Sequence, residues 1–125
     1  MVNLQVDELT IDVDERTPGS IVLRWLGRSA SRTPGTVLQP WFEDIFMTAR
    51  QKSLAVVMHF EALEHFNSST IAALIQLIAS AQSRGIPLTV HYDSRRKWQT
   101  LSFDALKRAL QPADGAPAPV QFVGE

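Results

Sequence analysis

Two nearly continuous apolar segments, residues 53–60 and 86–92, lie on either side of the clearest helical pattern in the chain. Between them, over residues 68–84, apolar side chains recur at helical spacing, and Gly85 follows where a helix C-terminus favours glycine. Strand–helix–strand units with short connections have right-handed crossovers that place both strands parallel in one sheet. Apolar runs of this kind are typical of strands covered on both faces. The sequence therefore predicts an α/β fold whose sheet contains parallel pairs.

The first part of the chain predicts further strands. Residues 2–14 alternate between apolar and polar side chains, which indicates one or two half-buried strands with a kink near Asp7. A β-rich segment at 20–26 ends at Gly27. The stretch 27–36 is rich in glycine, serine, arginine, threonine and proline, and it predicts a loop.

The remaining expected elements are helices at 38–51 and 94–110, loops at 61–66 and 112–119, and a last strand at 120–123. The first of these helices is expected to begin near Pro40, because proline suits a first helical turn. The element order is then β, β, α, β, α, β, α and a final β. Because the chain is short, we expect a small mixed sheet with about three helices packed largely on one face, in a single domain of residues 1–125.

The composition excludes several kinds of protein. With 12 basic and 13 acidic residues the net charge is −1, which provides no basic surface for nucleic acid or an anionic membrane. The absence of cysteine excludes disulfide scaffolds, thiolate metal sites and cysteine nucleophiles. The longest strongly apolar stretch, residues 71–79, is much shorter than the roughly 20 residues that span a bilayer. No basic segment followed by a long apolar one is visible at the start, so we expect no signal peptide and a cytoplasmic protein.

Four consecutive small polar residues, Asn67, Ser68, Ser69 and Thr70, stand at the start of the helix predicted over 68–84. Asparagine and serine are frequent N-cap residues, because their side-chain oxygens accept hydrogen bonds from unpaired N–H groups of the first turn. A helix N-terminus also stabilises anions, so a phosphorylated hydroxyl would be tolerated there. The residues alone leave two interpretations open, a structural cap and a phosphorylation site.

Residues 54–110 resemble a STAS domain, the fold of anti-sigma-factor antagonists. That family has a buried strand, a loop ending in Asp-Ser-Ser/Thr-Gly-Leu, an amphipathic helix, a strand and a last helix, and this chain has Asn-Ser-Ser-Thr-Ile at 67–71. SiaC-type regulatory phosphoproteins, which are single STAS-like domains, are similar in two places. Their motif reads close to Leu-Asn-Thr-Ser-Ser-Ile, where this chain has Phe-Asn-Ser-Ser-Thr-Ile at 66–71. They also carry a Tyr-Asp-x-Arg-like segment, where this chain has His-Tyr-Asp-Ser-Arg-Arg at 91–96.

The resemblance implies a non-catalytic signalling protein of a bacterial-type partner-switching pathway, without a cofactor. The hydroxyl directly after the Asp or Asn, here Ser68, would be phosphorylated by a serine/threonine kinase and dephosphorylated by a metal-dependent, PP2C-type phosphatase. Its state would control binding to a downstream target protein. Ser69 and Thr70 are alternative acceptors. The expected partner-binding residues around the acceptor are Glu64, His65, Asn67, Ser69 and Thr70.

Two other functions compete with the phosphorylation switch. A hydrolytic triad can be written from Ser68, His65 and Glu64, but side chains adjacent in sequence rarely converge in that geometry, and no nucleophile-elbow glycines flank the serine. The chief alternative is a constitutive protein-interaction or scaffold domain that binds without phosphorylation.

Metal and nucleic-acid binding have weaker patterns still. His59 and His91 fall in strands that can be neighbours and have carboxylates nearby, but no short His-x-x-His spacing occurs, so we expect no metal site. The basic segment 95–97 beside Trp98 could contact nucleic acid or an acidic partner. Three charges are a small footprint, so we expect no nucleic-acid partner.

Overall fold

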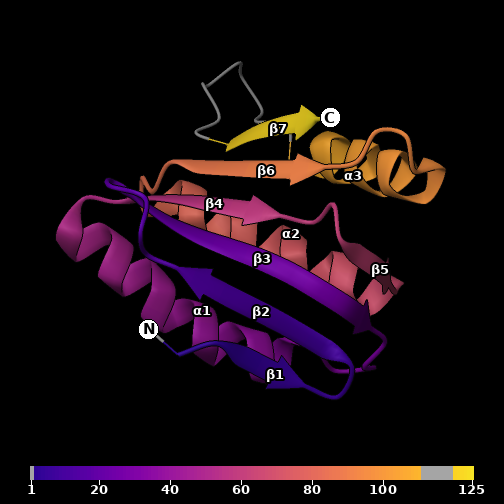
Figure 1. The fold of residues 1–125 in the computed structure, drawn as a ribbon, viewed down its shortest axis with the longest axis horizontal. Helices are drawn as coiled ribbons and strands as arrows, with labels where there is room; N and C mark the ends of the chain where they lie inside the picture. The colour runs from indigo at the N-terminus through magenta and orange to yellow at the C-terminus, as the bar shows by residue number, and fades with distance from the viewer. Residues whose placement is uncertain (1, 111–119) are drawn as a thin grey trace.

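The computed structural model describes residues 2–110 and 120–125, which form a seven-stranded mixed sheet and three helices (Figure 1). The strands are β1 (Leu4–Val6), β2 (Leu9–Asp14), β3 (Ser20–Ser29), β4 (Ala55–His59), β5 (Leu63–Phe66), β6 (Leu88–Tyr92) and β7 (Val120–Gly124). The helices are α1 (Gly35–Lys52), α2 (Ser68–Ser83) and α3 (Lys97–Ala109). The loop expected at 112–119 lies outside the described residues.

The sheet combines an antiparallel part with a parallel part. Its strands follow the order β1-β2-β3-β4-β6-β7, and the short β5 pairs with β3. The first three strands are antiparallel, whereas β3, β4, β6 and β7 run parallel. The long β3 pairs with β4 through residues 20–24 and with β5 through residues 27–29. The predicted mixed sheet is confirmed. β5, which pairs with the C-terminal end of β3, leads into α2.

All three helices cover the same face of the sheet, as predicted (Figure 1). Between the two layers, the rings of Trp25 and Phe60 stack with their centroids 4.8 Å apart. Along β4, Val56 and Met58 are fully buried, while Val57 between them is half-buried. The expectation that the apolar strands are covered on both faces is therefore wrong. Small and β-branched residues in these strands also line the face that no described helix covers.

β3 continues through Gly27 to Ser29, so part of the loop expected at 27–36 is strand. Gly27 has a φ of 85°, and the pairing register of β3 with β5 shifts directly after it. Glycine adopts this left-handed conformation readily, and an irregularity of this kind bends a strand without ending it. The glycine is therefore a bend within β3 and not its end.

Two other boundaries differ from the prediction. α1 begins at Gly35, directly after Pro34, so Pro40 lies inside the helix. Residues 63–66, expected within a loop, form β5 because their backbone pairs with the end of β3. A strand of four residues has too few positions to display an alternating pattern.

Candidate functional site

Asn67 caps α2 and holds the start of that helix against the end of β3. Its side-chain oxygen accepts hydrogen bonds from the Thr70 backbone N–H (2.9 Å) and from the Thr70 hydroxyl (2.8 Å). Its side-chain amide donates to the Ser31 carbonyl (2.9 Å), and its backbone N–H donates to the Ser29 carbonyl (3.1 Å). The cap interpretation of this segment is therefore confirmed.

Thr70 belongs to the interior of the protein. Its side chain is fully buried, and Ser29, which is 3% exposed, lies against it. The two hydroxyl oxygens are 2.7 Å apart, and because the Thr70 hydroxyl donates to Asn67, the Ser29 hydroxyl is the donor between them. A buried hydroxyl is reachable neither by a kinase nor by a partner. The structure thus removes Thr70 from the expected acceptors and from the expected partner contacts.

Thr70→Val should lower the free energy of unfolding by about 1–2 kcal/mol. Valine keeps the shape of threonine but takes a hydrogen-bond partner from the Ser29 hydroxyl and from Asn67. Equilibrium chemical denaturation measures the change. Thr36→Val is the matched control, because the Thr36 hydroxyl donates to a carbonyl at an exposed position. Equal losses in the two variants would contradict the structural role of Thr70.

Ser68 is the first residue of α2, and its side chain is exposed, whereas that of Ser69 is half-buried. Among the described residues, no hydrogen bond engages the Ser68 hydroxyl. Asn67 and Thr70 form the cap between themselves, so the Ser68 hydroxyl is not needed for it. Of the hydroxyls in this segment, that of Ser68 is the most accessible.

Glu64 and His65 precede the cap on β5, the first exposed and the second half-buried. Successive side chains of a strand point to opposite faces, so these two do not lie side by side. The His65 ring lies near Trp98 of α3 instead, with 6.4 Å between ring centroids. The structure therefore does not assemble Glu64, His65 and Ser68 into a hydrolytic triad, and it leaves Glu64 and His65 near the start of α2.

Gln99 on α3 braces the turn between β4 and β5, a role that no sequence pattern indicates. Its buried side-chain amide donates to the carbonyls of Phe60 (2.8 Å) and Leu63 (3.2 Å). Its side-chain oxygen accepts from the Asp93 backbone N–H (2.7 Å). Arg96 also donates to the Leu63 carbonyl, at 3.0 Å. α3 therefore holds the turn that leads into β5 and α2.

Two of the three basic residues at 95–97, Arg95 and Arg96, make hydrogen bonds within the chain. The backbone N–H and the side-chain Nε of Arg95 donate to the Asp93 carboxylate, at 2.9 and 3.1 Å. These bonds hold the pKa of Asp93 below its ordinary value. Arg96 donates to the carbonyls of Glu61 and Leu63. These contacts give the nucleic-acid alternative no support.

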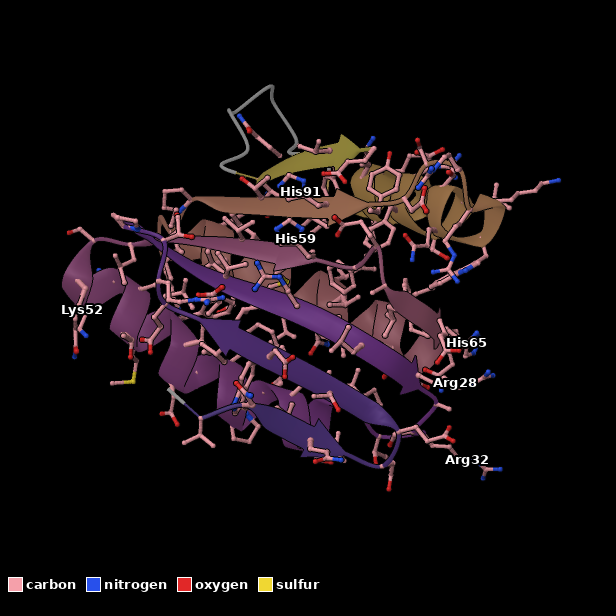
Figure 2. All side chains as sticks on the ribbon, viewed as in Figure 1. Arg28, Arg32, Lys52, His59, His65 and His91 are labelled. Atoms are coloured by element: carbon pink, nitrogen blue, oxygen red, sulfur yellow. The ribbon has the colours of Figure 1, made fainter. Side chains whose placement is uncertain are left out.

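Arg28, Arg32 and His65 gather at the end of the molecule where α2 begins (Figure 2). Arg28 is the register partner of His65 in the pairing of β3 with β5. Both arginine side chains are exposed, and within the described ranges neither has a hydrogen-bond or ion-pair partner. Positive charge is therefore available near Ser68, alongside the exposed carboxylate of Glu64.

His59 and His91 stack on the uncovered face of the sheet, with ring centroids 4.5 Å apart and 11° between the rings (Figure 2). The Nδ1 atoms lie 3.0 Å from the Glu61 carboxylate and 3.1 Å from that of Glu125. Partial burial acts to raise the pKa of Glu61, but hydrogen bonds with its own backbone N–H and with His59 hold it below its usual value. The predicted proximity of the histidines is confirmed. In the described part of the chain, no group of three or more His, Cys, Asp or Glu side chains is placed to hold a metal ion.

Within residues 2–110, no helix is both long enough and apolar enough to cross a membrane.

The sequence matches no protein-family model and no curated protein. Two solved structures are similar in fold. The anti-sigma factor antagonist SpoIIAA in its unphosphorylated form has a TM-score of 0.52 at 13% identity, over 73% of this chain and 79% of that one. A protein of the DUF3478 family from Shewanella loihica PV-4, with a SpoIIAA-like fold, has a TM-score of 0.54 at 9% identity, over 100% of this chain and 93% of that one. At such identities the likeness concerns the fold alone, and it shows that this chain has a STAS-like fold.

Proposed function

We propose that this chain is a non-catalytic signalling protein whose binding to partner proteins is switched by reversible phosphorylation of Ser68. The observation that carries the proposal is an exposed hydroxyl at the start of α2, beside a cap that Asn67 and Thr70 complete without it. The fold adds support, because SpoIIAA is an anti-sigma factor antagonist whose solved structure is that of its unphosphorylated form. A partner-switching role is consistent with both.

Phosphorylation of Ser68 would change the charge of this surface and leave the helix intact. A phosphoserine carries about −1.5 to −2 charges at neutral pH, which exceeds the net charge of −1 of the whole chain. The N-terminus of α2 stabilises negative charge, and Arg28 and Arg32 lie at the same end of the molecule. A partner packed on unmodified Ser68 through neutral contacts would be displaced by the bulk of the phosphate and by the cost of desolvating it.

The surface proposed for partner binding comprises Glu64, His65, Asn67 and Ser69 around Ser68, with Ser69 as the second choice of acceptor. The proposed partners are a serine/threonine kinase, a PP2C-type phosphatase and a downstream target protein. We place the protein in the cytoplasm, as a single domain over residues 1–125, acting without cofactor, metal, nucleic acid or membrane. The STAS-like fold and the motif at 66–71 support this pathway.

Mass spectrometry after incubation with ATP and an extract of the source cell, with phosphatases inhibited, tests the acceptor. We expect one added phosphoryl group on the wild type, mapped to Ser68, and none on Ser68→Ala. Ser69→Ala is the matched control and should be modified like the wild type. A phosphoryl group that is still added to Ser68→Ala would show that another residue is the acceptor. A wild type that stays unmodified would contradict the proposed phosphorylation switch.

Ser68→Glu and Ser68→Gln separate the switch from a constitutive scaffold, because the two replacements differ in charge and hardly in size. We expect both variants to unfold at the wild-type midpoint. Ser68→Glu should lose at least tenfold in affinity for proteins that the unmodified wild type captures, whereas Ser68→Gln should retain most of it. Equal binding by all three proteins would indicate a scaffold that binds through another surface.

A further inference from the structure

β7 forms one edge of the sheet, and in the described part of the chain no strand pairs with its outer side (Figure 1). Its sequence, Val-Gln-Phe-Val-Gly, contains neither a charge nor a proline. The opposite edge, β1, is three residues long and ends at a turn in which Asp7 has a φ of 53°. Proteins protect sheet edges by making them short, charged or interrupted by proline. β1 is protected because it is short, whereas β7 is protected neither by a charge nor by a proline.

The hydrogen bonds of Glu125 show which backbone groups of β7 face outward. Its N–H donates to the Tyr92 carbonyl (3.0 Å), and its carbonyl accepts from the Ser94 N–H (2.9 Å), so both groups face β6. Backbone groups alternate sides along a strand, so those of residues 121 and 123 also face β6. The residues whose N–H and C=O groups face the outer edge are therefore Val120, Phe122 and Gly124.

We propose that this edge pairs with the same edge of a second copy of the chain, the two β7 strands running antiparallel about a two-fold axis at Phe122. In this register Phe122 faces Phe122 of the second copy, and Val120 faces Gly124. Each facing pair exchanges both of its N–H···O bonds, so every outward backbone group gains a partner. A two-fold axis presents one patch to an identical patch, which is the commonest symmetry of homodimers.

The side chains around β7 are compatible with a second copy. Phe122 is half-buried on the helical side of the sheet, and the ring of a second Phe122 across the axis would cover part of what remains exposed. The Lys107 ammonium lies 5.9 Å from the Phe122 ring centroid. Its charge is balanced by the Asp104 carboxylate, 4.0 Å away. The two copies therefore meet through uncharged strands, and the neighbouring Lys107 is paired within each copy.

The dimer is expected to be weak and reversible. One five-residue strand pair buries less than the roughly 1,200 Å² at which stable interfaces begin. Analytical ultracentrifugation of the full chain from roughly 5 to 500 µM therefore covers the relevant range. We expect the mass to rise from that of one chain toward twice that value. A single-chain mass throughout overturns the proposal, and so does a series of masses beyond two chains, because pairing about a two-fold axis is closed.

Two double variants test the register. The side chains of Gln121 and Val123 lie on the uncovered face, and across the axis the two positions would face each other with about 4.5 Å between Cα atoms. Gln121→Lys with Val123→Lys sets like charges opposite each other and should weaken dimerisation at least tenfold. Gln121→Lys with Val123→Glu sets opposite charges there and should preserve or strengthen it.

Circular dichroism and the unfolding midpoint of both double variants verify that each is folded. Dimerisation of the Lys/Lys variant at wild-type concentrations would overturn the proposal, because the dimer would then use another surface. Loss of dimerisation in a folded Lys/Glu variant would overturn it as well, because the register would be different. Neither substitution touches Ser68 or its surroundings, so the outcome is independent of the proposed function.

Discussion

Replacing Gln99 by leucine is expected to lower the free energy of unfolding by about 3 kcal/mol, although the two side chains are similar in size. Gln99 is fully buried, and its side chain pairs with the carbonyls of Phe60 and Leu63 and with the N–H of Asp93. Leucine leaves these three backbone groups without that partner, and each unpaired buried polar group costs about 1–3 kcal/mol. The total stays below the simple sum, because the Leu63 N–H still donates to the Phe60 carbonyl (3.0 Å) and Arg96 still donates to the Leu63 carbonyl. Equilibrium denaturation in urea measures the loss.

Thr100→Val is the matched control for Gln99→Leu, because it removes a hydrogen bond from the next position of the same helix. The Thr100 hydroxyl donates to the Ser94 carbonyl (3.0 Å) at a half-buried site, so we expect a loss below about 1 kcal/mol. Hydrogen exchange should also quicken over residues 61–70 in Gln99→Leu and stay unchanged in Thr100→Val. Similar losses in both variants, or exchange that quickens evenly over the whole chain, would show that Gln99 does not brace this turn.

Periodicity predicted the long elements because each has enough residues to display its pattern. The helix expected at 68–84 is α2, at Ser68–Ser83, and the β-rich segment expected at 20–26 lies within β3, at Ser20–Ser29. β5 was not predicted, because it is defined by its pairing with β3 and not by any pattern in its four residues. Gln99 was not predicted as a brace for a similar reason, since its partner Phe60 lies 39 positions earlier in the chain.

The chemistry of single residues predicted part of the candidate site. Asparagine before a helix predicted the cap, and the structure has it. The same argument could not rank the three hydroxyls that follow, because their accessibility depends on a distant part of the chain. Thr70 is buried by its contact with Ser29, which lies 41 positions away, while Ser68, two positions before it, is exposed to solvent. Burial thus separates a structural hydroxyl from a candidate acceptor where composition cannot.

Gly27→Ala is expected to lower the free energy of unfolding by at least about 3 kcal/mol. Gly27 has a φ of 85°, where a Cβ atom is strained, and that atom would lie 2.0 Å from the Glu8 carbonyl oxygen. The obstacle is backbone, so the turn between β1 and β2 has to move. That movement also disturbs the hydrogen bond from the Arg28 N–H to the same carbonyl (3.1 Å). Equilibrium denaturation measures the loss, with circular dichroism to establish that the variant folds.

Gly85→Ala separates the steric clash from the cost of the left-handed backbone. Gly85 has a φ of 69°, but a Cβ atom there would meet nothing within 4 Å, so its replacement should cost only about 1 kcal/mol. Equal losses of unfolding free energy at the two glycines would mean that the turn at Glu8 moves without an energetic cost.

The two variants should also differ at the candidate site. Gly27 lies two positions before Ser29, whose hydroxyl and carbonyl hold Thr70 and Asn67, so Gly27→Ala should quicken hydrogen exchange at the Thr70 N–H. Gly85 follows the C-terminal end of α2, and the cap at Asn67 does not depend on it. Gly85→Ala should therefore leave hydrogen exchange at the Thr70 N–H unchanged.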